Sequence, residues 1–426
     1  MQETGNAKIE KALFYLVLIF SCLAYIGYYF YARRNGVPLL ISYSRSNQAM
    51  MEYNPPFVMF FRFGKDVCVA LLLFVEMFTM NRTVRVKIFI AMLFLAIYGT
   101  AISLLNDAPL NTIISGYRMI LFFSAFAMFF NSKYKLYISL KTFLRLITVL
   151  LLINTIIAAI QAFDVLGFDF MRIGQESYRF MGLFPAGAAF AFYSFGVALS
   201  AYIIDEHTKV YHKNCMMIFI ISFIGCYLSG TRSSMINLLI VLFIYLVNRS
   251  GIKRLQKIFV LMFLAFPVVV YIIQFATNWA NRGSIFENAL EGGRFSIFMN
   301  SIFGQSTVNI VLGNGIGAGS NSATEFNRLV SGDLLFLDGT FTTLLYQFGV
   351  LGLILSLIFI WRITKKVYCR KGLLDTTLFT GTILLQCLTT NVLEAFALLA
   401  MLFVCYYALI EGDKIFCELR AENVNS

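Results

Sequence analysis

The chain has 426 residues, of which 59% are hydrophobic and only 13% are charged. Soluble globular domains contain about 25% charged residues, so this composition excludes a soluble protein and indicates an integral membrane protein. The formal net charge is +12. This charge does not point to a nucleic-acid partner, because the cations lie mostly in short segments between apolar runs, where they orient a chain in the membrane.

Apolar runs close to 20 residues long predict transmembrane helices rather than the shorter strands of an outer-membrane barrel. We therefore expect an all-α, polytopic membrane protein with about 12 transmembrane helices. The predicted spans are residues 11–32, 63–80, 87–105, 113–130, 139–162, 184–204, 215–229, 233–248, 257–275, 341–361, 374–392 and 395–411.

A single transmembrane domain is expected over residues 1–426, with one long polar interval, 277–340, between the ninth and tenth spans. If the N-terminus is cytoplasmic, basic inner loops such as the one that holds Arg85 follow the positive-inside rule. Arg33 and Arg34 then lie outside, as an exception. This orientation predicts that both termini are cytoplasmic and that 277–340 is external.

Residues 228–234, LSGTRSS, place an arginine among hydroxyls where two apolar runs turn into each other. An arginine is costly in hydrocarbon, so Arg232 should face a polar cavity and have a partner. A guanidinium flanked by Thr231 and Ser233 at a helix N-terminus suits a phosphate group. The alternative is that Arg232 extends to lipid headgroups.

Three more single arginines fall on the outer side, at Arg118, Arg179 and Arg294. Each alone is better explained by the membrane interface, but together with Arg232 they favour a convergent pocket for an anion. Lys65 and the neighbouring Asp66 are candidates for an ion pair at the mouth of the second span.

The run LGNGIGAGSN, residues 312–321, has alternating glycines but lacks the preceding strand and the following Lys-Ser/Thr of a nucleotide-binding loop. It predicts a tight backbone turn instead. Asp338, just before the tenth span, is a candidate general base, with a simple helix cap as an equal alternative. The two histidines, His207 and His212, lie in an inner loop, which excludes a Ser-His-Asp triad and a His-Cys metal site on the outer face.

Four stretches together resemble the bacterial O-antigen polymerases (Wzy) and, more distantly, the O-antigen ligases. They are LSGTRSS (228–234), YRFMGLFPAGAAFA (178–191), a Gly-Arg pair at Arg294 followed by LGNGIGAG (312–319), and DGTFTTLLYQFGVLGLI (338–354). Their order and spacing cover most of the chain from Lys65 onward.

The resemblance implies polymerisation of undecaprenyl-pyrophosphate-linked oligosaccharide repeat units on the outer face of the bacterial cytoplasmic (inner) membrane, without metal, nucleotide or other cofactor. It implies Arg232 and Arg294 as catalytic pyrophosphate ligands, with Asp338 as base or acceptor-orienting group. It also implies Arg118 and Arg179 as supporting pyrophosphate ligands. Lys65, Thr231 and Ser233 complete the predicted substrate-binding residues. Besides the lipid-linked substrate and membrane lipid, a chain-length regulator protein is a candidate partner.

Two alternatives stay open. An O-antigen ligase carries a histidine near the position of Asp338, and this sequence has none there, which favours a polymerase. A flippase for lipid-linked oligosaccharides belongs to a different class, and it is expected to have two comparable halves and short outer loops.

Overall fold

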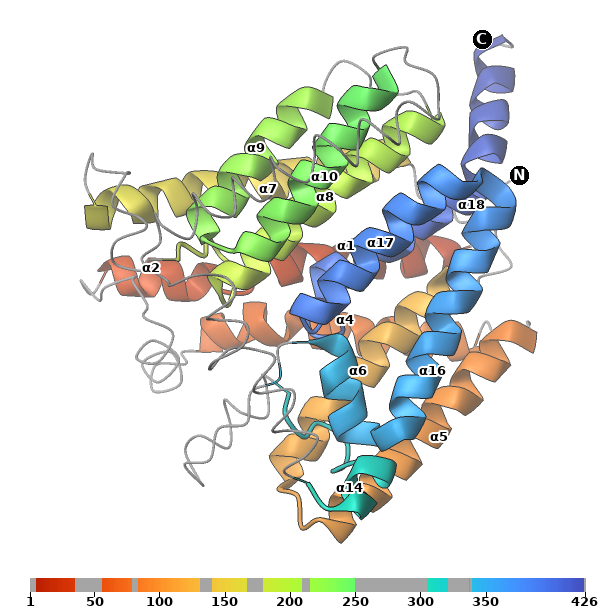
Figure 1. Cartoon of the computed structure of the whole chain (residues 1–426). Coiled ribbons are helices and arrows are strands. Elements are labelled where there is room, and N and C mark those ends of the chain that lie inside the picture. Colours follow the sequence, from red (N-terminus) through yellow and green to blue (C-terminus); the bar gives the residue numbers. More distant parts are fainter. Residues whose placement is uncertain are drawn as a thin grey trace. The chain divides into compact units, whose positions relative to one another are not determined.

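A computed structural model of the chain describes residues 5–34, 56–78, 83–130, 140–166, 179–208, 215–249, 305–320, 337 and 339–424. Within these ranges the regular elements are helices and no strand occurs (Figure 1). The helices are α1 (Gly5–Cys22), α2 (Ile26–Arg34), α4 (Pro56–Phe78), α5 (Thr83–Leu105), α6 (Leu110–Phe129), α7 (Leu140–Leu166), α8 (Gly187–Thr208), α9 (Cys215–Ser229), α10 (Arg232–Arg249), α14 (Thr307–Leu312), α16 (Thr340–Lys371), α17 (Leu373–Thr389) and α18 (Phe396–Val424).

Five helices in the described ranges are long and apolar enough to cross a membrane. They are Thr83–Leu105, Leu110–Phe129, Leu140–Asp164, Gly187–Glu206 and Thr340–Lys371. The expectation of a helical membrane protein is thus confirmed, while the number of twelve spans stays a prediction. The predicted span 257–275 lies outside the described residues.

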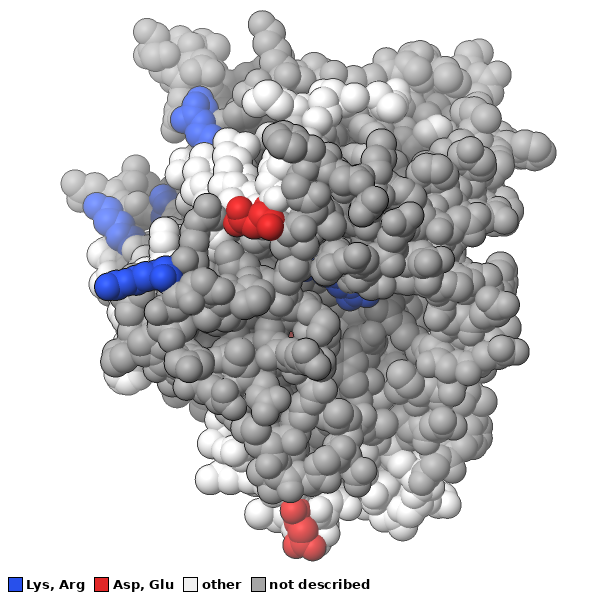
Figure 2. Space-filling view, turned by 90° about the vertical axis from the view of Figure 1, so that its left-hand side faces the viewer, with Lys and Arg blue, Asp and Glu red and all other residues white. Residues whose placement is uncertain are grey.

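The outward face of α5 shows how these helices meet their surroundings. Ile90, Phe94, Ile97 and Leu104 are 52–65% exposed and are spaced to lie on one face of the helix. Figure 2 views a different face, the left-hand side of Figure 1, and shows a few described Lys, Arg, Asp and Glu side chains there. An apolar helical stripe of this length is stable against lipid rather than water.

The chain divides into two compact units, and the division falls within α1, α4 and α18. One unit comprises Met1–Leu18, Gly64–Tyr137 and Glu287–Phe403, and we call it unit 1. The other, unit 2, comprises Ile19–Phe63, Ile138–Phe286 and Val404–Ser426. Whether both belong to one transmembrane domain stays a prediction.

In unit 2, helix α8 packs against α7, α9 and α10 (Figure 1). In the most apolar stretch of α8, 89% of the residues are buried, so α8 is enclosed by protein on nearly all sides. Small residues permit the close approach of α9, because a Cβ at Gly225 would collide with the Ser194 side chain. Tyr193 on α8 donates to the carbonyl oxygen of Ile147 on α7 at 2.7 Å.

The predicted first span, 11–32, is two helices rather than one, because the chain turns between α1 and α2. The backbone groups of this turn find partners in unit 2. Asn154 donates to the carbonyl oxygen of Cys22 at 3.3 Å, and the N–H of Tyr25 donates to that of Leu183 at 3.1 Å. The interruption between α1 and α2 is stable because the backbone groups that lose their helical hydrogen bonds there are bonded to other parts of the protein.

In unit 1, aromatic rings join α1, α6 and α18. Phe14 stacks on Phe129 with ring centroids 4.8 Å apart, and Phe122 stacks on Phe396 at 3.8 Å. Both pairs include a fully buried ring. Stacked rings of this kind add to the stabilisation that comes from the burial of apolar area.

Arg85 corrects one detail of the predicted topology. We expected it in an inner loop, yet α5 begins at Thr83 and the Arg85 side chain is 1% exposed. Its Nη2 lies 3.6 Å from Glu10 Oε2, and its Nε donates to the carbonyl oxygen of Met128 at 3.3 Å. A buried guanidinium requires such a counter-ion, so Arg85 is part of the core.

The predicted turn at residues 312–321 is confirmed over its described part, 312–320, which packs into unit 1. Gly313, Gly315, Gly317 and Gly319 all have positive φ. Ile316 is fully buried against α5, α6 and α16, and its N–H donates to the carbonyl oxygen of Gly99 at 3.2 Å. The loop reaches this depth because the glycines leave room for its backbone.

The loop also explains a break in α16. Gly349 has φ 59° and ψ −155°, and a Cβ there would overlap the carbonyl oxygen of Val311. The N–H groups of Asn314 and Gly315 bond the carbonyl oxygens of Tyr346 and Gln347 at 2.8 and 3.0 Å. The loop thus satisfies carbonyl groups on the turn of α16 just before the break.

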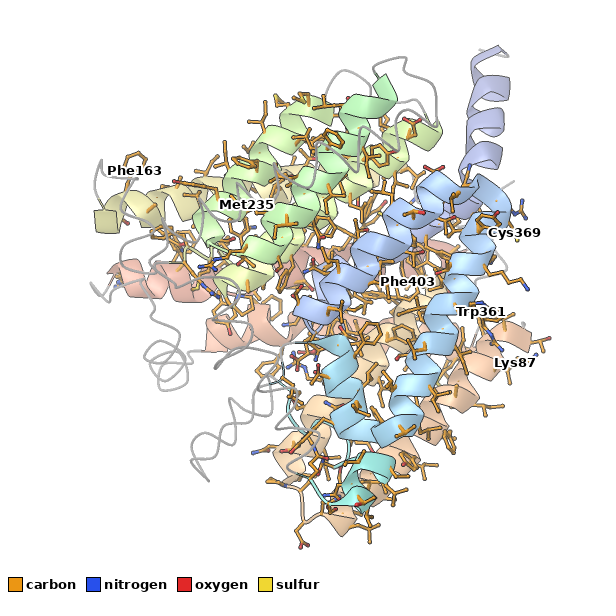
Figure 3. The ribbon with its side chains drawn as sticks, in the orientation of Figure 1. Lys87, Phe163, Met235, Trp361, Cys369 and Phe403 are labelled. Carbon is orange, nitrogen blue, oxygen red and sulfur yellow. The ribbon has the colours of Figure 1, made fainter. Side chains whose placement is uncertain are left out.

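Cysteine labelling tests the orientation of unit 1. Cys369 is exposed near the end of α16 (Figure 3), and Leu110 is 70% exposed at the start of α6. In a Cys417→Ser background, we expect a membrane-impermeant maleimide to label Cys369 only after the membrane is opened. The variant Leu110→Cys, made with Cys369→Ser, should react in intact cells. Labelling of both sites from one side would show that the predicted orientation is wrong.

Replacement of Gly317 by alanine tests the docking of the loop. Gly317 has φ 82°, and a Cβ would overlap the carbonyl oxygen of Thr112. Because an L-residue is strained there and the overlap adds to the strain, Gly317→Ala should cost about 2 kcal/mol or more of stability. The matched control is Gly381→Ala in α17, where a Cβ meets nothing within 4 Å. Thermal unfolding of the purified protein should distinguish the two, and equal midpoints would contradict the described docking.

Candidate functional site

The LSGTRSS turn lies in unit 2 and has the predicted form. Helix α9 ends at Ser229, Gly230 has φ 62°, and α10 begins at Arg232. The hydroxyl of Ser229 donates to the carbonyl oxygen of Cys226 at 2.7 Å and accepts from the N–H of Thr231 at 3.3 Å. The turn is therefore held by its own hydroxyls, which fixes the start of α10.

The chain around Arg179 runs directly beside this turn. The N–H of Phe180 donates to the carbonyl oxygen of Leu228 at 3.1 Å. A Cβ added at Gly187 would lie 3.0 Å from Arg179 Cβ and 3.2 Å from the carbonyl oxygen of Ser229. The structure thus brings together two arginines that are 53 residues apart in the sequence.

Two amide side chains of α7 hold this segment, and our sequence analysis missed them. The side-chain oxygen of Gln161 accepts from the N–H groups of Met181 and Gly182, both at 3.1 Å. The side-chain oxygen of Asn154 accepts from the N–H of Leu183 at 2.8 Å. The sequence does contain a sign of this role. The two amides are seven residues apart, so they lie on one face of a mostly apolar helix.

The electrostatics of this cluster favour an anion. Arg232 precedes the apolar run 233–248, and partial burial together with the positive charge of Arg179 lowers its pKa. An arginine nevertheless stays protonated at neutral pH. Its Nη2 is buried and has no hydrogen-bond partner among the residues that the structure describes. Two neighbouring cations of this kind become more stable when an anion binds them.

The helix N-terminus adds to this preference. The first N–H groups of a helix lack partners inside it and carry a partial positive charge. Thr231 is buried at this end of α10, and Ser233 is half-buried in its first turn. Arg179, Arg232 and the start of α10 therefore suit a phosphate or pyrophosphate group.

The other predicted cations that the structure describes lie in unit 1. Arg118 on α6 pairs with Asp66 on α4, with Nε 2.9 Å from Oδ1 and Nη2 3.0 Å from Oδ2. Lys65 is 8% exposed, and both Lys65 and Arg118 lie within 6 Å of the Phe396 ring centroid, at 5.9 and 5.7 Å. The sequence predicted an ion pair between Lys65 and Asp66, whereas the ion pair that the structure describes for Asp66 is with Arg118, two helices further along the chain.

Arg294 and Asp338 lie outside the described residues, so their predicted roles stay predictions. The residues that flank Asp338 are described. Leu337 is fully buried, and Gly339 precedes the first residue of α16.

Comparison with models of known protein families gives no match, and comparison with curated protein sequences gives none either.

Substitution of Arg232 tests the anion site. Arg232→Ala and Arg232→Lys should each weaken binding of inorganic pyrophosphate to the purified protein about tenfold or more. Lysine keeps a charge but loses the planar fork, and beside Arg179 it loses its proton more easily. The matched control is Arg145→Lys, an exposed cation on α7 of the same unit, which should bind normally. Calorimetry measures all four proteins, and unchanged binding by Arg232→Lys would show that only a general positive charge is needed.

Proposed function

We propose that the protein polymerises undecaprenyl-pyrophosphate-linked oligosaccharide repeat units into a surface polysaccharide such as O-antigen. The reaction takes place on the outer face of the cytoplasmic membrane and needs no nucleotide sugar. The proposal rests on one observation above all, which is the position of Arg179 beside the turn that holds Arg232 at the start of α10.

The chemistry of the substrate explains why arginines are needed. A sugar linked to pyrophosphate already has a good leaving group. An acceptor hydroxyl attacks the anomeric carbon, the bond from this carbon to the pyrophosphate oxygen breaks, and the pyrophosphate leaves with the electron pair. The enzyme must stabilise the charge on the departing oxygens and remove the proton of the acceptor hydroxyl. Arg232 and Arg179 serve the first task, with Arg294 in support, and Asp338 serves the second.

The sequence resemblance supports the same assignment. The stretches that carry it include both the LSGTRSS turn and the segment that holds Arg179. In the structure these two stretches are joined by the bond from Phe180 to Leu228. Residues that the resemblance implies for one ligand thus lie next to each other in unit 2.

The species that accumulates in a mutant strain tests the proposal. Arg232→Ala and Arg232→Lys should abolish the polymer while the protein remains in the membrane. Single lipid-linked repeats should then collect on the outer leaflet and still reach the final acceptor, because transfer across the membrane precedes the step that Arg232 serves. The surface should carry one repeat unit and no ladder on a gel. An Arg145→Lys strain should make polymer of normal length.

Two other outcomes would contradict the proposal. Long lipid-linked chains with a bare acceptor would indicate a ligase. Single repeats that an external glycosidase cannot reach would indicate a flippase, and Arg294→Ala should be examined in the same way.

A further inference from the structure

The cluster around Asp66 in unit 1 differs in chemistry from the arginine pair in unit 2. Asp66 and Arg118 meet fork to fork, and their side chains are 22% and 24% exposed, so both can reach a ligand. Arg118 uses Nε and Nη2 for this pair and keeps three N–H donors for other partners. A carboxylate with two oxygens likewise keeps lone pairs beyond those that Arg118 occupies.

A further polar side chain contacts the residue that follows Arg118. Asn391, in the segment between α17 and α18, is 3% exposed, and its Nδ2 lies 3.7 Å from the sulfur of Met119, the residue after Arg118. Its Oδ1 is buried and has no hydrogen-bond partner among the described residues. A buried amide oxygen in this state is costly unless a ligand or water donates to it.

The mixture of acceptors and donors argues against a phosphate here. A phosphate bound to Arg118 would sit beside the carboxylate of Asp66, and the two negative charges would repel each other. A sugar hydroxyl both donates and accepts, so it can donate to Asp66 and accept from Arg118. The Phe396 ring is partly exposed, and because Phe122 stacks on one of its faces, only the exposed part of the ring is left to pack against a sugar.

We propose that Asp66 and Arg118, beside the partly exposed ring of Phe396, bind a sugar of the acceptor repeat unit, with Asp66 accepting a hydrogen bond from one of its hydroxyl groups. This inference rests on the proposed function and assigns Asp66, which the sequence analysis treated only as an ion-pair partner. Arg118 is then a sugar ligand oriented by Asp66 rather than a pyrophosphate ligand.

Two binding probes test the inference on the purified full-length protein. One is the oligosaccharide repeat released from the organism's own surface polysaccharide, and the other is inorganic pyrophosphate. Asp66→Asn should weaken oligosaccharide binding about tenfold and leave pyrophosphate binding unchanged, because one charge-assisted hydrogen bond is lost. The matched control is Asp107→Asn, an exposed carboxylate between α5 and α6 whose φ of 50° asparagine tolerates. It should bind both probes normally.

A charge exchange separates a sugar contact from a purely structural ion pair. The double variant Asp66→Arg, Arg118→Asp keeps an ion pair and should unfold near the wild-type temperature, yet bind the oligosaccharide weakly and make no polymer. If it makes polymer, the pair is only structural and the inference falls. Normal oligosaccharide binding by Asp66→Asn, or equal loss of both probes, overturns it as well.

The proposed function fails separately from this inference. If Arg232→Ala leaves polymer and pyrophosphate binding intact, the function is wrong whatever Asp66 does. If Arg232→Ala behaves as expected while Asp66→Asn binds the oligosaccharide like the wild type, only the acceptor site is wrong.

Discussion

A polar group among apolar helices must find a partner inside the protein, and the described structure depends on this constraint. The side chain of Gln161 makes three such hydrogen bonds. Its oxygen accepts from two backbone N–H groups, and its nitrogen donates to the carbonyl oxygen of Gly182 at 2.9 Å. Thr340 does the same in unit 1. Its hydroxyl donates to the carbonyl oxygen of Thr390 at 2.8 Å and accepts from the N–H of Val392 at 2.9 Å. A few short polar side chains thus hold the places where the chain leaves a helix.

Three arginines show how surroundings decide the role of one residue type. Arg85 is buried against a carboxylate and belongs to the core. Arg118 forms a bidentate ion pair with Asp66, and because its side chain is partly exposed it can still contact a ligand. Arg232 lies beside a second cation, and one of its nitrogens is buried without a partner among the described residues. Of the three, Arg232 has the surroundings that best suit binding of an anion.

Much of the helix pattern was predictable, because a hydrocarbon environment requires long apolar runs. The expected spans 87–105, 215–229 and 233–248 match α5, α9 and α10 within a few residues. The LSGTRSS turn was predictable for a related reason, since hydroxyls and a glycine interrupt the apolar run there. The break between α1 and α2 was not, because residues 23–25 are themselves ordinary and their partners lie far away in the sequence.

The candidate site was predictable only in part. Single arginines on one predicted side of the membrane indicated a pocket, and the structure places the segment of Arg179 beside the turn that holds Arg232. The partner of Asp66 was not predictable, because Arg118 is 52 residues away and Lys65 is adjacent. The burial of Arg85 was hidden for the same reason, since its counter-ion Glu10 lies in the first helix.

The docked loop has a consequence for the order in which the protein is made. Ile316 bonds Gly99 on α5, and the loop bonds the turn of α16 that ends at Gly349, so unit 1 joins segments about 250 residues apart. At a synthesis rate of about 5–20 residues per second, α5 waits roughly 12–50 s for α16 to emerge. During that time Gly99 and Ser103 lack the partners that they have in the finished protein. Unit 1 is therefore exposed to quality control in the membrane during this interval, and a ribosome pause before residue 340 would lengthen that exposure.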